Sequence, residues 1–166
     1  PETSLELQQH SLACLAYLPN ELRGDLTINK LILDFIDSNN AFEIRAQAVK
    51  TSLSHELESY DPVVDVINSI LVDPRESEQL RNSTIKAIAN HGQRFLSIPT
   101  KLLRSLENFA RTERNSSSRE ITFKILGLYG DRESLLALND AEATLKTQKQ
   151  KSSLEQSKAI IIKRIG

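Results

Sequence analysis

Apolar residues recur at three- and four-residue spacing along most of the chain, as in the run Ile28, Leu31, Ile32 and Phe35. This spacing puts them on one face of an amphipathic α-helix. No segment alternates apolar and polar residues, so the sequence predicts an all-α fold. The predicted helices span residues 3–18, 25–38, 41–57, 61–72, 75–91, 98–112, 116–129, 131–148 and 151–165. Their short connections favour antiparallel neighbours.

Every second predicted helix carries related residues in the same order. We call these B helices and the others A helices. The lead residues of the B helices follow one another after 36, 36, 38 and 39 residues: Gln9, Arg45, Arg81, Arg119 and Lys158. Positions three, four and seven after the lead lie on one helical face, so we expect them to pack. A helical repeat of this length indicates a solenoid, in which each unit buries its apolar face against its neighbours.

Four B helices open with a pattern that predicts a capping box, in which two side chains bond the free amides of the first turn. The four pairs are Thr3 with Glu6, Asn40 with Glu43, Ser117 with Glu120, and Ser152 with Glu155. The Lys-rich segment 146–151 reads as a loop between the last two helices.

The strongest copy of the repeat joins Arg119 to Leu126-Gly127 and then to Gly130-Asp131. This pattern resembles the HEAT-repeat family, in particular its short bacterial form, which is also seen in phycobilisome-lyase-type repeats. The resemblance implies an α–α superhelix of about nine helices in antiparallel pairs, with the B helices on the concave face. It also implies a scaffold for protein partners. We expect one such domain over residues 1–166, and we expect it to be a piece of a longer chain, because the repeat both begins and ends on a B helix.

The resemblance also suggests structural roles for the repeat positions. It implies that Arg45, Arg81 and Arg119 pair with carboxylates or helix-end carbonyls of adjacent repeats, with Asp131 as one possible partner. Gly127 is small enough to let the next helix approach closely or to let the turn begin. Gly130 precedes Asp131 just before the next A helix.

A second set of positions is the better candidate for binding. Lys50, Lys86, Lys124 and Lys163 stand five residues after their lead positions, where the first copy has Cys14. This offset is about 140° around a helix of 3.6 residues per turn, away from the packing face. The lysines would form a ladder for an acidic partner segment or a phosphate backbone. The alternative is a solvated helix face that happens to carry lysine.

The predicted helix 98–112 adds Lys101, Arg104 and Arg111 as possible binding residues. Charge is uneven along the chain, because residues 1–73 hold 4 Lys/Arg and 12 Asp/Glu, whereas residues 74–166 hold 17 and 10. A basic C-terminal half favours nucleic acid as the alternative partner. However, Glu107 interrupts the cluster, and few aromatic residues are present to stack on bases. A solvated helix face is again the alternative.

No residue set indicates catalysis, a cofactor, a metal ion or a small-molecule substrate. His10, His55 and His91 fall in different repeats, and we expect Cys14 to be a buried structural thiol within an apolar stretch. No apolar run approaches the roughly 20 residues that span a membrane, and one cysteine fits a reducing cytoplasm. We therefore expect a non-catalytic, cytoplasmic module that binds a protein. A nucleic-acid-binding domain and a sensor array of a larger signalling protein are the alternatives, and nothing supports a bilin lyase.

Overall fold

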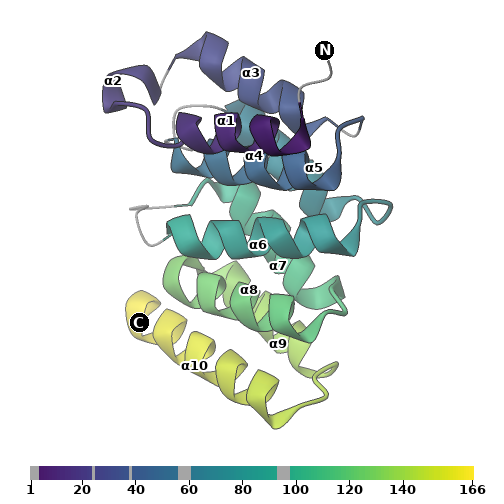
Figure 1. Ribbon diagram of the computed structural model, residues 1–166. Helices are drawn as coiled ribbons and strands as arrows, with labels where there is room; N and C mark the ends of the chain where they lie inside the picture. Colours follow the sequence, from purple (N-terminus) through teal and green to yellow (C-terminus); the bar gives the residue numbers. More distant parts are fainter. Residues whose placement is uncertain (1–3, 24, 38, 56–60, 93–97) are drawn as a thin grey trace. The chain divides into compact units, whose positions relative to one another are not determined.

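The computed structural model describes residues 4–23, 25–37, 39–55, 61–92 and 98–166 (Figure 1). These described residues form ten α-helices and no strand, which confirms the all-helical prediction. Contacts between Cα atoms divide the chain into two compact units, Pro1–His91 and Gly92–Gly166. A single superhelix over the whole chain stays a prediction.

The first unit alternates A and B helices along the chain. Its elements are α1 (Leu5–Leu15), α2 (Asn20–Arg23), α3 (Leu26–Ile36), α4 (Phe42–Ser54), α5 (Asp61–Val72) and α6 (Glu78–Gly92). The B helix α4 packs against B helix α1 and against A helix α3, which in turn packs against A helix α5. Ile32, Ile44 and Leu53 have almost no exposed surface and lie in the core of this unit.

The second unit repeats this arrangement. Its helices are α7 (Thr100–Thr112), α8 (Ser116–Tyr129), α9 (Arg132–Glu142) and α10 (Gln148–Ile165). The B helices α8 and α10 pack against each other, as do the A helices α7 and α9, and each A helix packs against the B helix that follows it. Phe109 and Phe123 are the largest fully buried side chains of its core. Each unit therefore contains stacked A–B pairs.

Two predicted helices, 61–72 and 116–129, match α5 and α8 in both bounds. The four-residue helix α2 was not predicted, because a single turn has too few residues to show a period. The prediction was also wrong over 131–151, where α9 ends at Glu142 and α10 already begins at Gln148. Thr147 and Gln150 form a capping box there, so the Lys-rich segment starts a helix.

None of the predicted capping boxes appears in the described residues. Thr3 lies outside them, and α1 is capped by Ser4. Helix α4 begins after Ala41 without a side-chain cap, while the Asn40 amide donates to the Asp34 carbonyl. Helix α8 is capped by Asn115, two residues before the predicted cap. Several polar residues stand near each helix start, and packing decides which of them becomes the cap.

Two glycines of the second unit leave little or no room for a side chain, and neither has a positive φ. A Cβ on Gly127 would lie 3.1 Å from Cα, Cβ and Oγ of Ser157, so this glycine allows α8 and α10 to approach closely. A Cβ on Gly130 would overlap the Leu126 carbonyl oxygen and lie 2.6 Å from the Cβ of Ser134. The structural roles expected for both glycines fit these contacts.

Candidate interaction surface

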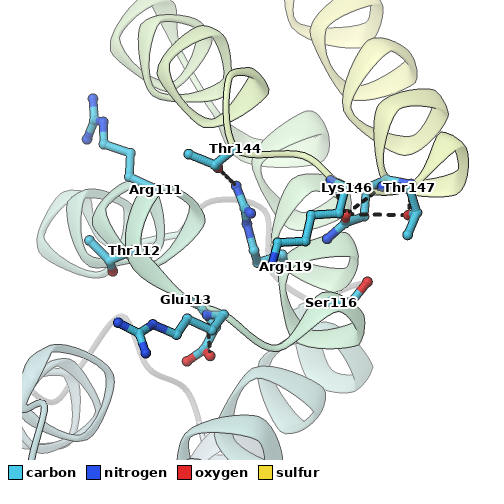
Figure 2. A pocket seen from close by; sticks show the side chains of 10 residues that line it. Arg111, Thr112, Glu113, Ser116, Arg119, Thr144, Lys146 and Thr147 are labelled. Atoms are coloured by element: carbon cyan, nitrogen blue, oxygen red, sulfur yellow. Dashed lines mark hydrogen bonds between the residues drawn. The ribbon is translucent and has the colours of Figure 1, made fainter.

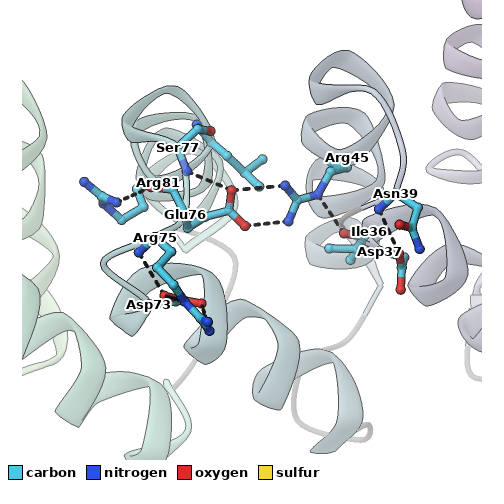
Figure 3. Close-up of polar contacts among 10 residues, drawn as sticks. Ile36, Asp37, Asn39, Arg45, Asp73, Arg75, Glu76, Ser77 and Arg81 are labelled. Carbon is cyan, nitrogen blue, oxygen red and sulfur yellow. Dashed lines mark hydrogen bonds and ion pairs between the residues drawn. The ribbon is translucent and has the colours of Figure 1, made fainter.

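Arg45, the lead residue of α4, links three elements of the first unit (Figure 3). Its Nε donates to the carbonyl of Ile36, the last residue of α3, at 2.9 Å. Its Nη1 and Nη2 bond Oε1 and Oε2 of Glu76, in the turn between α5 and α6, at 3.0 and 2.5 Å. Both side chains are largely buried, and the bond from Arg45 holds the pKa of Glu76 below its ordinary value.

Arg119, the lead residue of α8, makes the same kind of link in the second unit. Its Nε donates at 3.2 Å to the carbonyl of Ala110, near the end of α7. Its Nη2 donates to the Ala141 carbonyl at 3.1 Å and to Thr144 Oγ1 at 2.8 Å, at the end of α9. The guanidinium carbon also lies 5.6 Å from the ring centre of Phe123. Burial lowers the pKa of Arg119, and the charge of Glu113 acts in the opposite direction.

These two arginines occupy equivalent places. Each is the fourth residue of its helix, and each donates Nε to a carbonyl nine residues earlier. Arg81 is likewise the fourth residue of α6, and its Nη1 donates to the Glu76 carbonyl at 2.5 Å. The lead arginines therefore join their own B helix to neighbouring A helices or turns.

The expected partnership between Asp131 and a lead arginine does not occur. Asp131 instead pairs with Arg104 of α7, with Oδ2 2.5 Å from Nη2 and Oδ1 3.2 Å from Nη1. Its Oδ1 also accepts from the amides of Glu133 and Ser134, so Asp131 caps α9. Bonding to Arg104, more than any other cause, lowers the pKa of Asp131 to about 2.

All three candidate cations of α7 interact within the protein. Arg104 bonds Asp131, the buried carboxylate of Glu107, and Glu133, whose Oε2 lies 3.1 Å from Nε. Arg111 places Nε 3.0 Å from Oδ2 of Asp140 on α9. Lys101 is exposed and also has an interaction within the protein. The basic cluster thus helps to hold α7 against α9, which leaves less of its charge for a partner.

The lysine positions behave differently from the arginines. Lys50, Lys86 and Lys124 are each the ninth residue of their helix, and all three are exposed. Among the residues that the structure describes, none of the three has an ion-pair or hydrogen-bond partner. Lys50 and Lys86 belong to the first unit and Lys124 to the second. We call these three residues the lysine register.

Lys163 is exposed but does not belong to this register. It is the sixteenth residue of α10, and the lead residue assigned to that copy, Lys158, is the eleventh. The ninth residue of α10 is Gln156. The predicted lead residue, Lys158, therefore lies seven residues after the fourth residue of α10, Lys151. A shift of seven residues is about two helical turns and keeps the apolar residues on the same face. Leu154 and Ile161, seven residues apart, are both fully buried.

One member of the lysine register, Lys124, lines a groove in the second unit. Lys124 and Gln156 line this groove of about 330 Å³ between α8 and α10, together with Glu120 and Lys149, which form a 2.6 Å ion pair. Ser153 also lines it and is only 8% exposed, yet its Oγ has no hydrogen-bond partner among the described residues. This groove could not be predicted from the sequence, because it depends on how α8 and α10 are offset along their axes.

Cys14 and His55 differ in their exposure to solvent. Cys14 is exposed, so the expectation of a buried thiol was wrong; it is the tenth residue of α1, close to the solvent-facing position that holds lysine elsewhere. His55 is buried, and its two ring nitrogens bond the carbonyls of Arg23 and Leu15 at 3.0 and 3.2 Å. Within the described ranges no group of three or more His, Cys, Asp or Glu residues could hold a metal ion.

Comparison with known proteins gives no match among protein-family models, curated proteins or solved structures. Across the part of the chain that the structure covers, none of the helices has both the length and the apolar character needed to cross a membrane.

Proposed function

We propose that this protein is a non-catalytic binding module, a HEAT-like α-solenoid that engages an acidic segment of a protein partner. Support for the solenoid comes from features that recur in both units. Each unit stacks A–B helix pairs, and Arg45 and Arg119 use the same Nε bond to a carbonyl nine residues earlier. The same local link in two separate repeats fits a solenoid, whose units share one structure.

The lysine register is the observation that carries the binding proposal. The three lysines recur at the same place in α4, α6 and α8, are exposed, and have no partner in the described structure. The lead arginines of the same helices are engaged internally. Free ammonium groups at the same place on three of the five B helices suit an acidic partner.

The groove between α8 and α10 supports an extended protein segment as the partner. A carboxylate can pair with Lys124, while a backbone amide or carbonyl can bond the exposed side-chain amide of Gln156. An extended peptide carries both kinds of group. Nucleic acid is less well supported, because Arg104 and Arg111 are held in ion pairs with α9.

Two labelled probes separate these partners. A fluorescent peptide of alternating Glu and Ser residues and a fluorescent single-stranded oligonucleotide of equal charge are titrated with the whole chain, and anisotropy is followed. The proposal expects saturable binding of the peptide and weaker binding of the oligonucleotide. Tighter binding of the oligonucleotide, with an affinity that falls steeply as salt rises, would favour nucleic acid. Absence of peptide binding at low salt would refute the proposal.

A further inference from the structure

Arg119 is a buried cation of the second unit that forms no ion pair with a described carboxylate. This side chain is only 5% exposed, and its Nε and Nη2 are both bonded to protein oxygens. Its Nη1 has no hydrogen-bond partner in the described part of the chain, and no described carboxylate forms an ion pair with it. The Nη1 atom of Arg119 nevertheless retains access to solvent. Burial of a cation without a carboxylate partner is costly, so this arrangement needs an explanation.

The space next to Arg119 is a pocket of about 490 Å³ (Figure 2). It is lined by the end of α7, the first turn of α8 and the segment from Thr144 into the start of α10. Figure 2 shows the Arg119 side chain in its midst, with a dashed line joining it to Thr144. Arg119 therefore lines this pocket with a guanidinium that is only partly bonded to protein oxygens.

Positive charge outweighs negative charge around this pocket. Four of its ten lining residues are cations, Arg111, Arg114, Arg119 and Lys146, and one is an acid, Glu113. Arg111 is paired with Asp140, whereas the side chains of Arg114 and Lys146 have no partner among the described residues. The Oε1 of Glu113 is occupied by the backbone amides of Arg114 and Asn115 at 2.7 and 2.8 Å.

Two long helices also begin at the pocket. Ser116 is the first residue of α8, and Thr147 is the N-cap of α10, helices of 14 and 18 residues. The amide ends of helices carry partial positive charge and favour anions. The hydroxyl group of Ser116 adds a neutral donor beside the cations, whereas the Thr144 hydroxyl already donates to the Ala141 carbonyl.

We propose that this pocket binds the dianionic oxyanion of a phosphate monoester or of inorganic phosphate, with Arg119 Nη1 as the buried donor. Arg114 and Lys146 supply the charge at the rim. A guanidinium with a free terminal nitrogen suits a phosphate oxygen, and a tetrahedral dianion can use several of the donors at once. The site does not depend on the lysine register, since the α8–α10 groove and this pocket share none of their lining residues.

The test uses the whole ¹⁵N-labelled chain, titrated with inorganic phosphate and, separately, with a short peptide that carries one phosphoserine. Chloride keeps the ionic strength constant. We expect saturable chemical-shift changes at the amides of Ser116 and Thr147 and at the Arg119 Nε–H. Binding of both ligands identifies a phosphorylated side chain as a possible source, whereas binding of inorganic phosphate alone identifies free phosphate.

Two double variants test whether phosphate binds in this pocket. Arg114→Gln with Lys146→Gln should weaken phosphate binding about tenfold, since partly exposed charged contacts are worth about a factor of three each. The matched control, Lys124→Gln with Lys163→Gln, removes the same charge from the same unit and should leave phosphate affinity within about twofold. No saturable change with either ligand, or equal losses in the two variants, would overturn the proposal. The same control should weaken binding of the acidic peptide, so the two proposals fail independently.

Discussion

The guanidinium of Arg45 donates hydrogen bonds to both carboxylate oxygens of Glu76, 31 residues further along the chain, at 3.0 and 2.5 Å. The pair joins the first turn of α4 to the turn that leads into α6, and Arg45 also bonds the end of α3. One side chain therefore ties together two successive A–B pairs of the first unit. Packing alone would leave these polar chain ends without partners.

Replacing Arg45 by Met should lower the free energy of unfolding by about 2 kcal/mol, because it strands a largely buried carboxylate and a helix-end carbonyl. Urea unfolding followed by circular dichroism measures this change. Arg75→Met is the matched control: Arg75 also pairs with an aspartate, Asp73, but its side chain is 88% exposed. The control should leave the free energy of unfolding unchanged within error. Equal effects of the two substitutions would show that the Arg45 link is not structural.

Alanine at Gly127 should destabilise the protein, although alanine is normally the better helix former by about 1 kcal/mol. The added Cβ would meet the backbone and side chain of Ser157 at 3.1 Å and push α8 away from α10. We expect a net loss of about 1 kcal/mol, within the range for overpacked cores. Gly130→Ala should cost more, because its Cβ would overlap a carbonyl oxygen. Thermal unfolding of both variants shows which substitution destabilises more. A Gly127→Ala variant more stable than the wild type would contradict the close approach of α8 to α10.

Acid should weaken the second unit through Asp131. The pKa of Asp131 is lowered to about 2 from an ordinary 3.8. Its contribution to the free energy of unfolding is therefore complete above about pH 4 and is lost as the pH falls toward 2. Because the side chain is about half exposed, we expect a loss of only about 1 kcal/mol after solvent screening. Urea unfolding between pH 5 and 2 should show a steeper decline for the wild type than for Asp131→Asn, which keeps a capping side chain. If the free energy of unfolding fell equally in the wild type and in Asp131→Asn, Asp131 would not be the source of the acid sensitivity.

The exposed thiol of Cys14 should react freely in the folded protein. With a chromogenic disulfide reagent, we expect its rate to lie within about tenfold of the rate in denaturant, because an exposed cysteine is limited mainly by its thiolate fraction. Protection by several orders of magnitude in the folded state would mean that Cys14 is buried, as the apolar sequence around it suggests.

The exposure of Cys14 could not be predicted from the sequence. Helical periodicity identifies which residues share a face, and this was enough for the all-helical fold and for the bounds of α5 and α8. It cannot distinguish two faces of a short helix that both carry small apolar residues, as around Cys14. Exposure of that residue depends on which neighbours cover α1, and that is a property of the packed unit.

The last repeat shows a second limit. A slip of seven residues preserves the apolar face of a helix, so aligning Lys158 with the lead arginines appeared consistent. The helix start at Gln148 places Lys158 two turns further along, where it pairs with Glu142 and Glu155. Similarly, spacing indicated that the lead arginines are structural, but only the packing of α7 against α9 could reveal that Asp131 pairs with Arg104.

The lysine register is the central claim, and charge reversal tests it most directly. Lys86→Glu with Lys124→Glu is compared with a control of equal charge, Lys30→Glu with Lys151→Glu, in which both lysines are exposed but lie outside the register. Each pair changes one residue in each unit. Affinity for the fluorescent acidic peptide is measured by anisotropy at one salt concentration, after circular dichroism has shown that both variants are folded. We predict that the register variant loses at least about tenfold in affinity, while the control, acting only through screened long-range charge, loses less than about threefold. Equal losses in the two variants would contradict a specific role for Lys86 and Lys124.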